Sequence, residues 1–169
     1  MNYFELFELP VQFHPDPVMI KKKFYELSRK YHPDFYSKAG VNQQAEALET
    51  SSMVNRAYKT FLDEDATIRY VLKLYGLLEE EEKYELDKSY LMEVLELNEL
   101  LMEADPGDNS SIQEIKQKTE ELNNELYVSV KPILDNYKEG ITSEKELLQV
   151  KDYYFKKKYL RRILDKIGR

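Results

Sequence analysis

The sequence predicts an all-α protein built from two helical domains, and three observations support this. Only 5 of the 169 residues are Gly and 6 are Pro, which is few for a chain rich in turns. Apolar residues recur with helical spacing, and no stretch alternates with the period of a strand. Residues typical of helix starts and stops divide the chain into helical lengths, with four glutamates, 79–82, near the middle.

The chain begins with a short and then a longer predicted helix. Asn2 can cap a helix over 3–9, which Pro10 ends. Asp16 suits an N-cap with a proline after it, so a second helix should run over 17–31. That helix ends before Pro33, because a residue that precedes proline avoids helical dihedrals. Its apolar face comprises Ile20, Phe24, Leu27 and Tyr31.

Two more helices complete the first half. A polar loop through Gly40 leads to a third helix over 41–62, and 63–65 begins a fourth, which Gly76 can end as a C′ residue. We expect the third helix to bury five positions: Ala47, Met53 or Val54, Ala57, Tyr58 and Phe61.

Three longer helices are predicted in the second half, over 89–104, 110–138 and 142–167. The segment 105–109 has the composition of a turn. The second break is short, so its flanking helices should be antiparallel. Pro132 should kink or interrupt the middle helix.

The domain boundary is expected at the glutamate run, which is either a solvated linker or the first turn of a helix. The predicted parts are an N-terminal domain over 1–76, an acidic linker over 77–88 and a three-helix bundle over 89–169.

Composition excludes several classes of site. The chain has no Cys, so it has no disulfide and no thiolate site for zinc or an iron–sulfur cluster. It has two His, too few for a multi-histidine metal centre, and we expect no metal and no cofactor. No apolar run has the roughly 20 residues of a membrane span, and no secretory leader is recognisable. A cytoplasmic location is expected.

The net charge of −7 is unevenly distributed. Residues 18–31 carry +4 and residues 144–169 carry +5, whereas 76–126 carries −12. The acidic middle argues against nucleic-acid binding, which needs a basic surface. Separate charged faces are typical of protein-docking surfaces, although solvated helix faces would look the same.

The tripeptide His-Pro-Asp occurs twice, at 14–16 and at 32–34. The first copy is explained by the helix start that Asp16 and Pro17 make. The second follows the basic helix and precedes a polar loop, so its side chains should project from a turn. His32 could alternatively cap the negative end of that helix.

The second copy and its surroundings resemble the J domain of DnaJ-type co-chaperones. The basic helix end at 24–31 is followed by His-Pro-Asp, and 54–58 matches the family's Ile/Val-Asn-x-Ala-Tyr element. Residues 2–7, 69–72 and 90–97 are similar to the HscB branch, the J-type co-chaperones of iron–sulfur cluster assembly.

The resemblance implies that the J domain docks on an ATP-hydrolysing chaperone of the DnaK/HscA class and stimulates it in trans. The chain itself would then have no catalytic residue. Cations on the basic helix would steer docking, although lysines on such a face can also serve solubility alone. The residues expected to bind the chaperone are His32, Pro33, Asp34, Lys21, Lys22, Tyr25, Arg29 and Lys30.

The helix over 89–104 has a second informative face. A helical wheel places its core stripe at Tyr90, Val94, Leu97 and Leu101. Away from that stripe lies an arc of mixed apolar and acidic residues: Leu91, Met92, Leu95, Glu96, Glu99 and Glu103. This suits a docking patch with a flexible apolar centre and an acidic rim, or a surface helix with a stray Met.

The resemblance implies that this arc contacts an iron–sulfur scaffold protein of the IscU class. It also implies an aromatic contact from the last helix, which we place at Tyr159, with Phe155 as the alternative. The sequence departs from the resembled family in its extra copy at 14–16, which is assigned no function, and in the strongly basic and aromatic segment 153–169.

Two other functions remain open at this point. A general J-domain co-chaperone for unfolded clients is the alternative within the same class. An enzyme is disfavoured, because the chain lacks a P-loop, a G-x-S-x-G motif and a Gly-rich fingerprint. No membrane or nucleic-acid partner is expected.

Overall fold

The computed structural model describes residues 1–168, and every regular element in that range is helical. The all-α prediction is therefore confirmed. The chain divides into two compact units, which are described separately. The first comprises 1–74 with the short segment 137–139, and the second comprises 75–136 and the residues from Gly140 onward. None of the helices described could span a membrane, since none combines the needed length with an apolar sequence.

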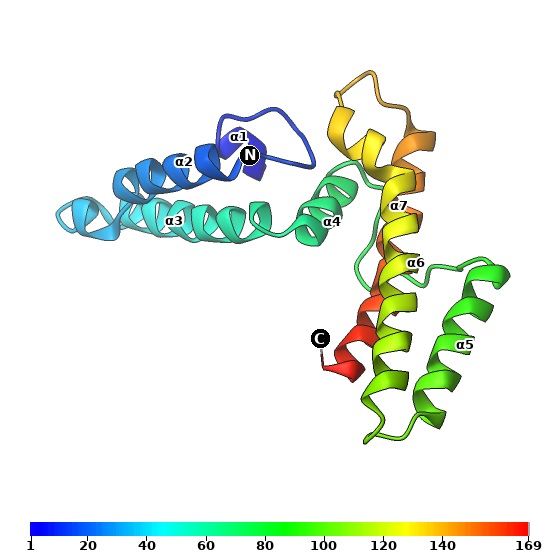
Figure 1. The fold of residues 1–169 in the computed structure, drawn as a ribbon. Coiled ribbons are helices and arrows are strands. Elements are labelled where there is room, and N and C mark those ends of the chain that lie inside the picture. Colours follow the sequence, from blue (N-terminus) through cyan, green and yellow to red (C-terminus); the bar gives the residue numbers. More distant parts are fainter. Residues whose placement is uncertain (169) are drawn as a thin grey trace. The chain divides into compact units, whose positions relative to one another are not determined.

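The first unit is a helical hairpin with two flanking helices (Figure 1). Helix α2 packs along α3, and the 3-10 turn η1 joins them. The aromatic rings of Phe4 and Phe7 lie 4.9 and 5.3 Å from that of Phe61, so the first turn is held against the end of α3. The elements are α1 (Tyr3–Leu6), α2 (Pro17–Lys30), η1 (Pro33–Tyr36), α3 (Val41–Phe61) and α4 (Glu64–Leu74).

The caps predicted from sequence form as expected. Asn2 and Glu5 make a reciprocal capping box, and the Asp16 carboxylate accepts from the N–H of Val18 at 2.9 Å. Gly76 has φ +70°, the left-handed conformation of a C′ glycine. The first helix, however, ends at Leu6 instead of reaching residue 9, so its predicted length was wrong.

The second unit is a bundle of α5 (Lys88–Glu103), α6 (Asn109–Asn136) and α7 (Glu144–Ile167). Helices α6 and α7 lie side by side over their length, and α5 packs on both (Figure 1). The core stripe of α5 is buried as predicted at Tyr90, Val94 and Leu97. Apolar residues of the other two helices are also buried in the core of this unit, among them Ile115, Val130, Val150, Leu160 and Ile163.

Helix α6 continues through Pro132, so of the two predicted outcomes, a kink or an interruption, the interruption does not occur. A proline removes one backbone donor, that to the carbonyl of Val128. Both residues are exposed, which leaves this carbonyl on the solvent side of the helix. The side-chain amide of Asn136 donates to the Pro132 carbonyl at 2.8 Å and supports the following turn.

The glutamate run is not helical; it belongs to an irregular segment, 77–87, with a turn at 80–81, and this segment is tied to α7. Glu82 pairs with Lys151 at 2.7 Å, with only 18% and 15% of the two side chains exposed. The ring of Tyr84 stacks on that of Phe155 at 4.5 Å, and its hydroxyl donates to Asp152 at 2.9 Å. An acidic sequence is therefore compatible with a packed connection.

Candidate functional site

The His-Pro-Asp loop at 32–34 is exposed and has a defined geometry. His32 is not the cap of α2, which is Tyr31; it is instead the N-cap of η1. Its Nδ1 accepts a hydrogen bond from the N–H of Asp34 at 3.2 Å. In the neutral imidazole the proton must then lie on Nε2, which is left as an N–H donor.

Hydrogen bonds hold the loop on both sides. The hydroxyl of Tyr36 donates to the carbonyl of Lys30 at 3.2 Å, which ties η1 back to the last turn of α2. The side-chain amide of Gln44, on α3, donates to the carbonyls of Ala39 and Ser37 at 2.9 and 3.3 Å. The motif is therefore presented on an ordered turn, a favourable arrangement for binding.

The basic face of α2 lies open to solvent. Lys21, Lys22, Arg29 and Lys30 are all exposed, and Tyr25 has 53% of its surface accessible among them. Lys23, on the edge of this face, is instead used within the unit, since it pairs with Glu8 at 2.9 Å. The Lys23 hydrogen bond and charge lower the pKa of the Glu8 carboxyl.

The first His-Pro-Asp copy has a structural role. His14 Nε2 lies 3.2 Å from a carboxylate oxygen of Glu64, Pro15 is buried, and Asp16 caps α2. The same tripeptide is therefore built into the unit at 14–16 and presented to solvent at 32–34.

Sequence reasoning missed Phe35, the residue after the motif. Its ring is 74% exposed and meets the His32 ring edge-on, with centroids 6.3 Å apart. The available signal was a large apolar residue inside a loop expected to be polar.

On α5, the arc of mixed residues is exposed as the helical wheel required. Leu91, Met92 and Leu95 have 41%, 56% and 49% of their surface accessible, and the glutamates of the arc are exposed beside them. Met102 was missed. It is 86% exposed and lies about 20° from Leu91 on the wheel, within the same arc.

The two candidate aromatics of α7 differ in burial. Phe155 is buried under Tyr84, so its ring is occupied within the core. Tyr159 is only partly buried, and the guanidinium of Arg162 lies 5.2 Å from its ring centre. This difference favours Tyr159 for contact with a partner.

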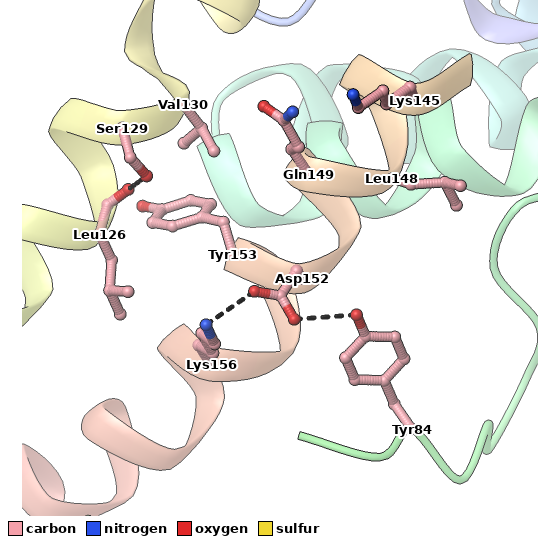
Figure 2. Close-up of a pocket in the computed structure, with 10 residues that line it drawn as sticks. All are labelled: Tyr84, Leu126, Ser129, Val130, Lys145, Leu148, Gln149, Asp152, Tyr153 and Lys156. Atoms are coloured by element: carbon pink, nitrogen blue, oxygen red, sulfur yellow. Dashed lines mark hydrogen bonds and ion pairs between the residues drawn. The ribbon is translucent and has the colours of Figure 1, made fainter. Parts of the chain in front are cut away.

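A groove of about 460 Å³ lies between α6, α7 and the segment around Tyr84, and it includes none of the predicted site residues. Figure 2 shows the polar network at its centre, in which Asp152 accepts from Tyr84 and pairs with Lys156 at 2.8 Å. Burial, followed by the hydrogen bond and charge of Asp152, raises the pKa of Tyr84 to about 12. These groups pair with one another, so the network ties the bundle together.

No group of three or more His, Asp or Glu side chains among residues 1–168 is placed to hold a metal ion. The two candidate surfaces are thus an exposed, hydrogen-bonded His-Pro-Asp loop beside a basic helix, and an exposed Leu/Met face with an acidic rim. Both are suited to contact with other proteins.

The hairpin with this loop defines the first unit as a J domain, and residues 2–70 match the DnaJ domain family. Residues 86–168 match the family described as the HSCB C-terminal oligomerisation domain. The chain belongs to the HscB family of J-domain proteins.

Two relatives illustrate the similarity. The chain is 34% identical over 122 residues to the human iron–sulfur cluster co-chaperone protein HscB, a match of 69% of this chain and 52% of the human protein. It is 37% identical over 102 residues to the co-chaperone protein HscB homolog of Vibrio cholerae, a match of 60% of each. The matched region thus spans half to three fifths of these relatives.

The fold agrees with two solved structures over 99% of this chain. The crystal structure of human co-chaperone protein HscB matches with a TM-score of 0.79 and 28% identity, over 81% of its own length. Chaperone HscB from Vibrio cholerae matches with a TM-score of 0.73 and 26% identity, over 96% of its length.

Proposed function

We propose that the chain is a cytoplasmic co-chaperone of iron–sulfur cluster assembly. In this proposal its J domain docks on a DnaK/HscA-class chaperone and stimulates ATP hydrolysis, and its second unit binds an IscU-class scaffold protein and delivers it to that chaperone. The observation that carries the proposal is the exposed His-Pro-Asp loop, held on an ordered turn at the end of an exposed basic helix. Family membership supports the same function.

The J-domain surface supplies binding and no chemistry. Lys21, Lys22, Arg29 and Lys30 would steer the helix toward an acidic patch of the chaperone, because opposite charges raise the rate of encounter. Tyr25 would be buried on docking as an aromatic anchor. The Nε2–H of His32 would then donate to an acceptor of the chaperone, while Asp34 accepts; the ATP is hydrolysed in the partner's own site.

The α5 face supports the scaffold-binding half of the proposal. Its exposed leucine and methionine side chains adapt to a partner's shape, and Glu96, Glu99 and Glu103 surround them with negative charge. The complementary partner has an apolar patch with basic residues around it. Tyr159 of α7 is the proposed aromatic contact.

The proposal is tested by the steady-state ATPase rate of the chaperone with and without this protein. Wild type should raise the rate, and His32→Gln should abolish the rise. Glutamine cannot reproduce the two functions of the imidazole, in which Nδ1 caps η1 and Nε2–H is offered to the partner. His14→Gln is the matched control, since it alters the same motif where it is structural. Full stimulation by His32→Gln, or none by wild type, would contradict the proposal.

The alternative of a general J-domain co-chaperone is distinguished by what the protein binds. The exposed apolar patch on α5 is small and rimmed with charge, which favours one folded partner over extended unfolded chains. Affinity capture should recover a single small scaffold protein. A heterogeneous set of clients would favour the alternative.

A further inference from the structure

Phe35 is the large apolar side chain of the docking loop, and it is turned outward. It is 74% exposed, whereas Tyr36, the next residue, is partly buried and used to tie the turn to α2. A phenyl ring that stays exposed to water adds no hydrophobic stabilisation to this unit. Its position beside the motif therefore suggests contact with another protein.

The position of Phe35 is fixed by the same bonds that fix the motif. Its N–H donates to the carbonyl of His32 at 3.0 Å, and the edge-on contact of the two rings sets the phenyl group beside the imidazole. The backbone that carries the ring is therefore in place before any partner binds, which lowers the entropic cost of covering the ring.

We infer that Phe35 is a further anchor of the chaperone-docking surface, and that its ring enters an apolar pocket of the chaperone next to the acceptor that meets His32. This inference rests on the proposed function. The partner is taken to be the chaperone surface that meets His32, because the Phe35 ring centre lies only 6.3 Å from the imidazole centre.

The roles of the two neighbours differ in a measurable way. His32 supplies a directional hydrogen bond on which stimulation depends, whereas Phe35 supplies apolar contact area, which is non-directional and insensitive to salt. Loss of Phe35 should weaken docking and leave the maximal stimulation intact. Loss of His32 should remove the stimulation itself.

The test is a titration of the full-length protein into the chaperone, in which the half-maximal concentration and the maximal ATPase rate are measured separately. Phe35→Ala should raise the half-maximal concentration about tenfold, by the same factor at low and high salt, with an unchanged maximal rate. Phe35→Leu, which keeps most of the apolar area, should remain within about threefold of wild type. Leu62→Ala, an exposed apolar residue at the other end of α3, should behave as wild type.

Three results would overturn the inference. A half-maximal concentration for Phe35→Ala within twofold of wild type would show that the ring is not covered. A change equal to that of Leu62→Ala would show a general surface effect. If Phe35→Ala titrates like wild type but no longer self-associates in sedimentation, the ring contacts a second copy of this chain instead of the chaperone. If wild type stimulates no ATPase, the proposed function fails first, and this inference with it.

Discussion

Two copies of one tripeptide show how far a residue's role depends on its neighbours. At 14–16 the histidine meets Glu64 and the aspartate caps a long helix; at 32–34 the histidine bonds within its own loop and keeps one ring nitrogen outward. The sequence distinguished them because Asp16 precedes Pro17 and an amphipathic helix. The partner of His14, 50 residues away, could not be predicted from local pattern.

At the same scale, the exposed apolar residues of α5 can be tested by truncation. Met92→Ala combined with Leu95→Ala should weaken binding of the scaffold protein by at least tenfold, because two side chains that would be covered by the partner are truncated. Isothermal titration calorimetry measures this affinity. The thermal unfolding temperature should change little, since both side chains lie outside the core.

Val128→Ala provides the control for this pair. Val128 is also exposed and apolar but lies on α6, outside the proposed surface. Equal affinity of the double variant and wild type, or an equal loss in the control, would argue against a role for the α5 face.

At the scale of the element, helix starts were predicted well and helix ends less well. Asn2 and Asp16 cap the helices assigned to them because a side-chain cap is a local interaction. The first helix was predicted too long: α1 stops at Leu6, and Glu8, with φ +55°, already has a left-handed backbone conformation. Helix α6 passes through Pro132 without an interruption, which was one of the two outcomes predicted for it. The burial of Phe155 depends on Tyr84, which is 71 residues away in sequence, so no periodicity could separate it from Tyr159.

Asp87 has two roles at the start of α5, which can be separated by substitution. Its carboxylate caps the helix through the N–H of Tyr90 at 2.8 Å and pairs with Lys156 of α7 at 2.9 Å. Asp87→Ala loses both and should lower the free energy of unfolding by about 1–2 kcal/mol. Asp87→Asn keeps a capping oxygen and should cost less, because the pair is partly exposed. Denaturant titration measures both.

The charge of Asp87 also predicts a pH dependence. The hydrogen bond from Lys156, and then that from Tyr90, lower the pKa of Asp87 below its ordinary value of 3.8. The folded protein therefore binds this proton less readily than the unfolded chain, so the charge stabilises the fold above pH 3.8 and this contribution is lost as the pH falls through the folded pKa. The stability difference between wild type and Asp87→Asn should shrink in acid; a difference that persists there would contradict this account.

At the scale of the whole molecule, charge is separated by surface. The basic face of α2 and the acidic rim of α5 lie on different units and are proposed to meet different partners. Composition indicated this separation, because the charges cluster along the chain. It could not show that the acidic segment 77–87 is packed, since that depends on Lys151 and Asp152 of α7.

Both proposed interactions should weaken as salt is raised, because each brings opposite charges together near water. The half-maximal concentration for ATPase stimulation and the dissociation constant for the scaffold should each rise severalfold between low and physiological salt. The double variant Lys21→Gln, Lys22→Gln should reduce the salt dependence of the half-maximal concentration for ATPase stimulation. The salt dependence of scaffold binding should be unchanged. Salt-independent binding in wild type would count against electrostatic steering.

The packing of the segment 77–87 also determines where domain boundaries can be placed in fragments and chimaeras of this protein. A fragment that starts at Ser89 would discard Glu82, Tyr84 and the cap at Asp87, leaving the poorly exposed Lys151 ammonium unpaired and the Phe155 ring uncovered. A graft of the bundle onto another J domain should therefore take its junction between Leu74 and Leu78. The acidic segment 77–87 must be kept with the bundle, because it is part of the fold of that unit.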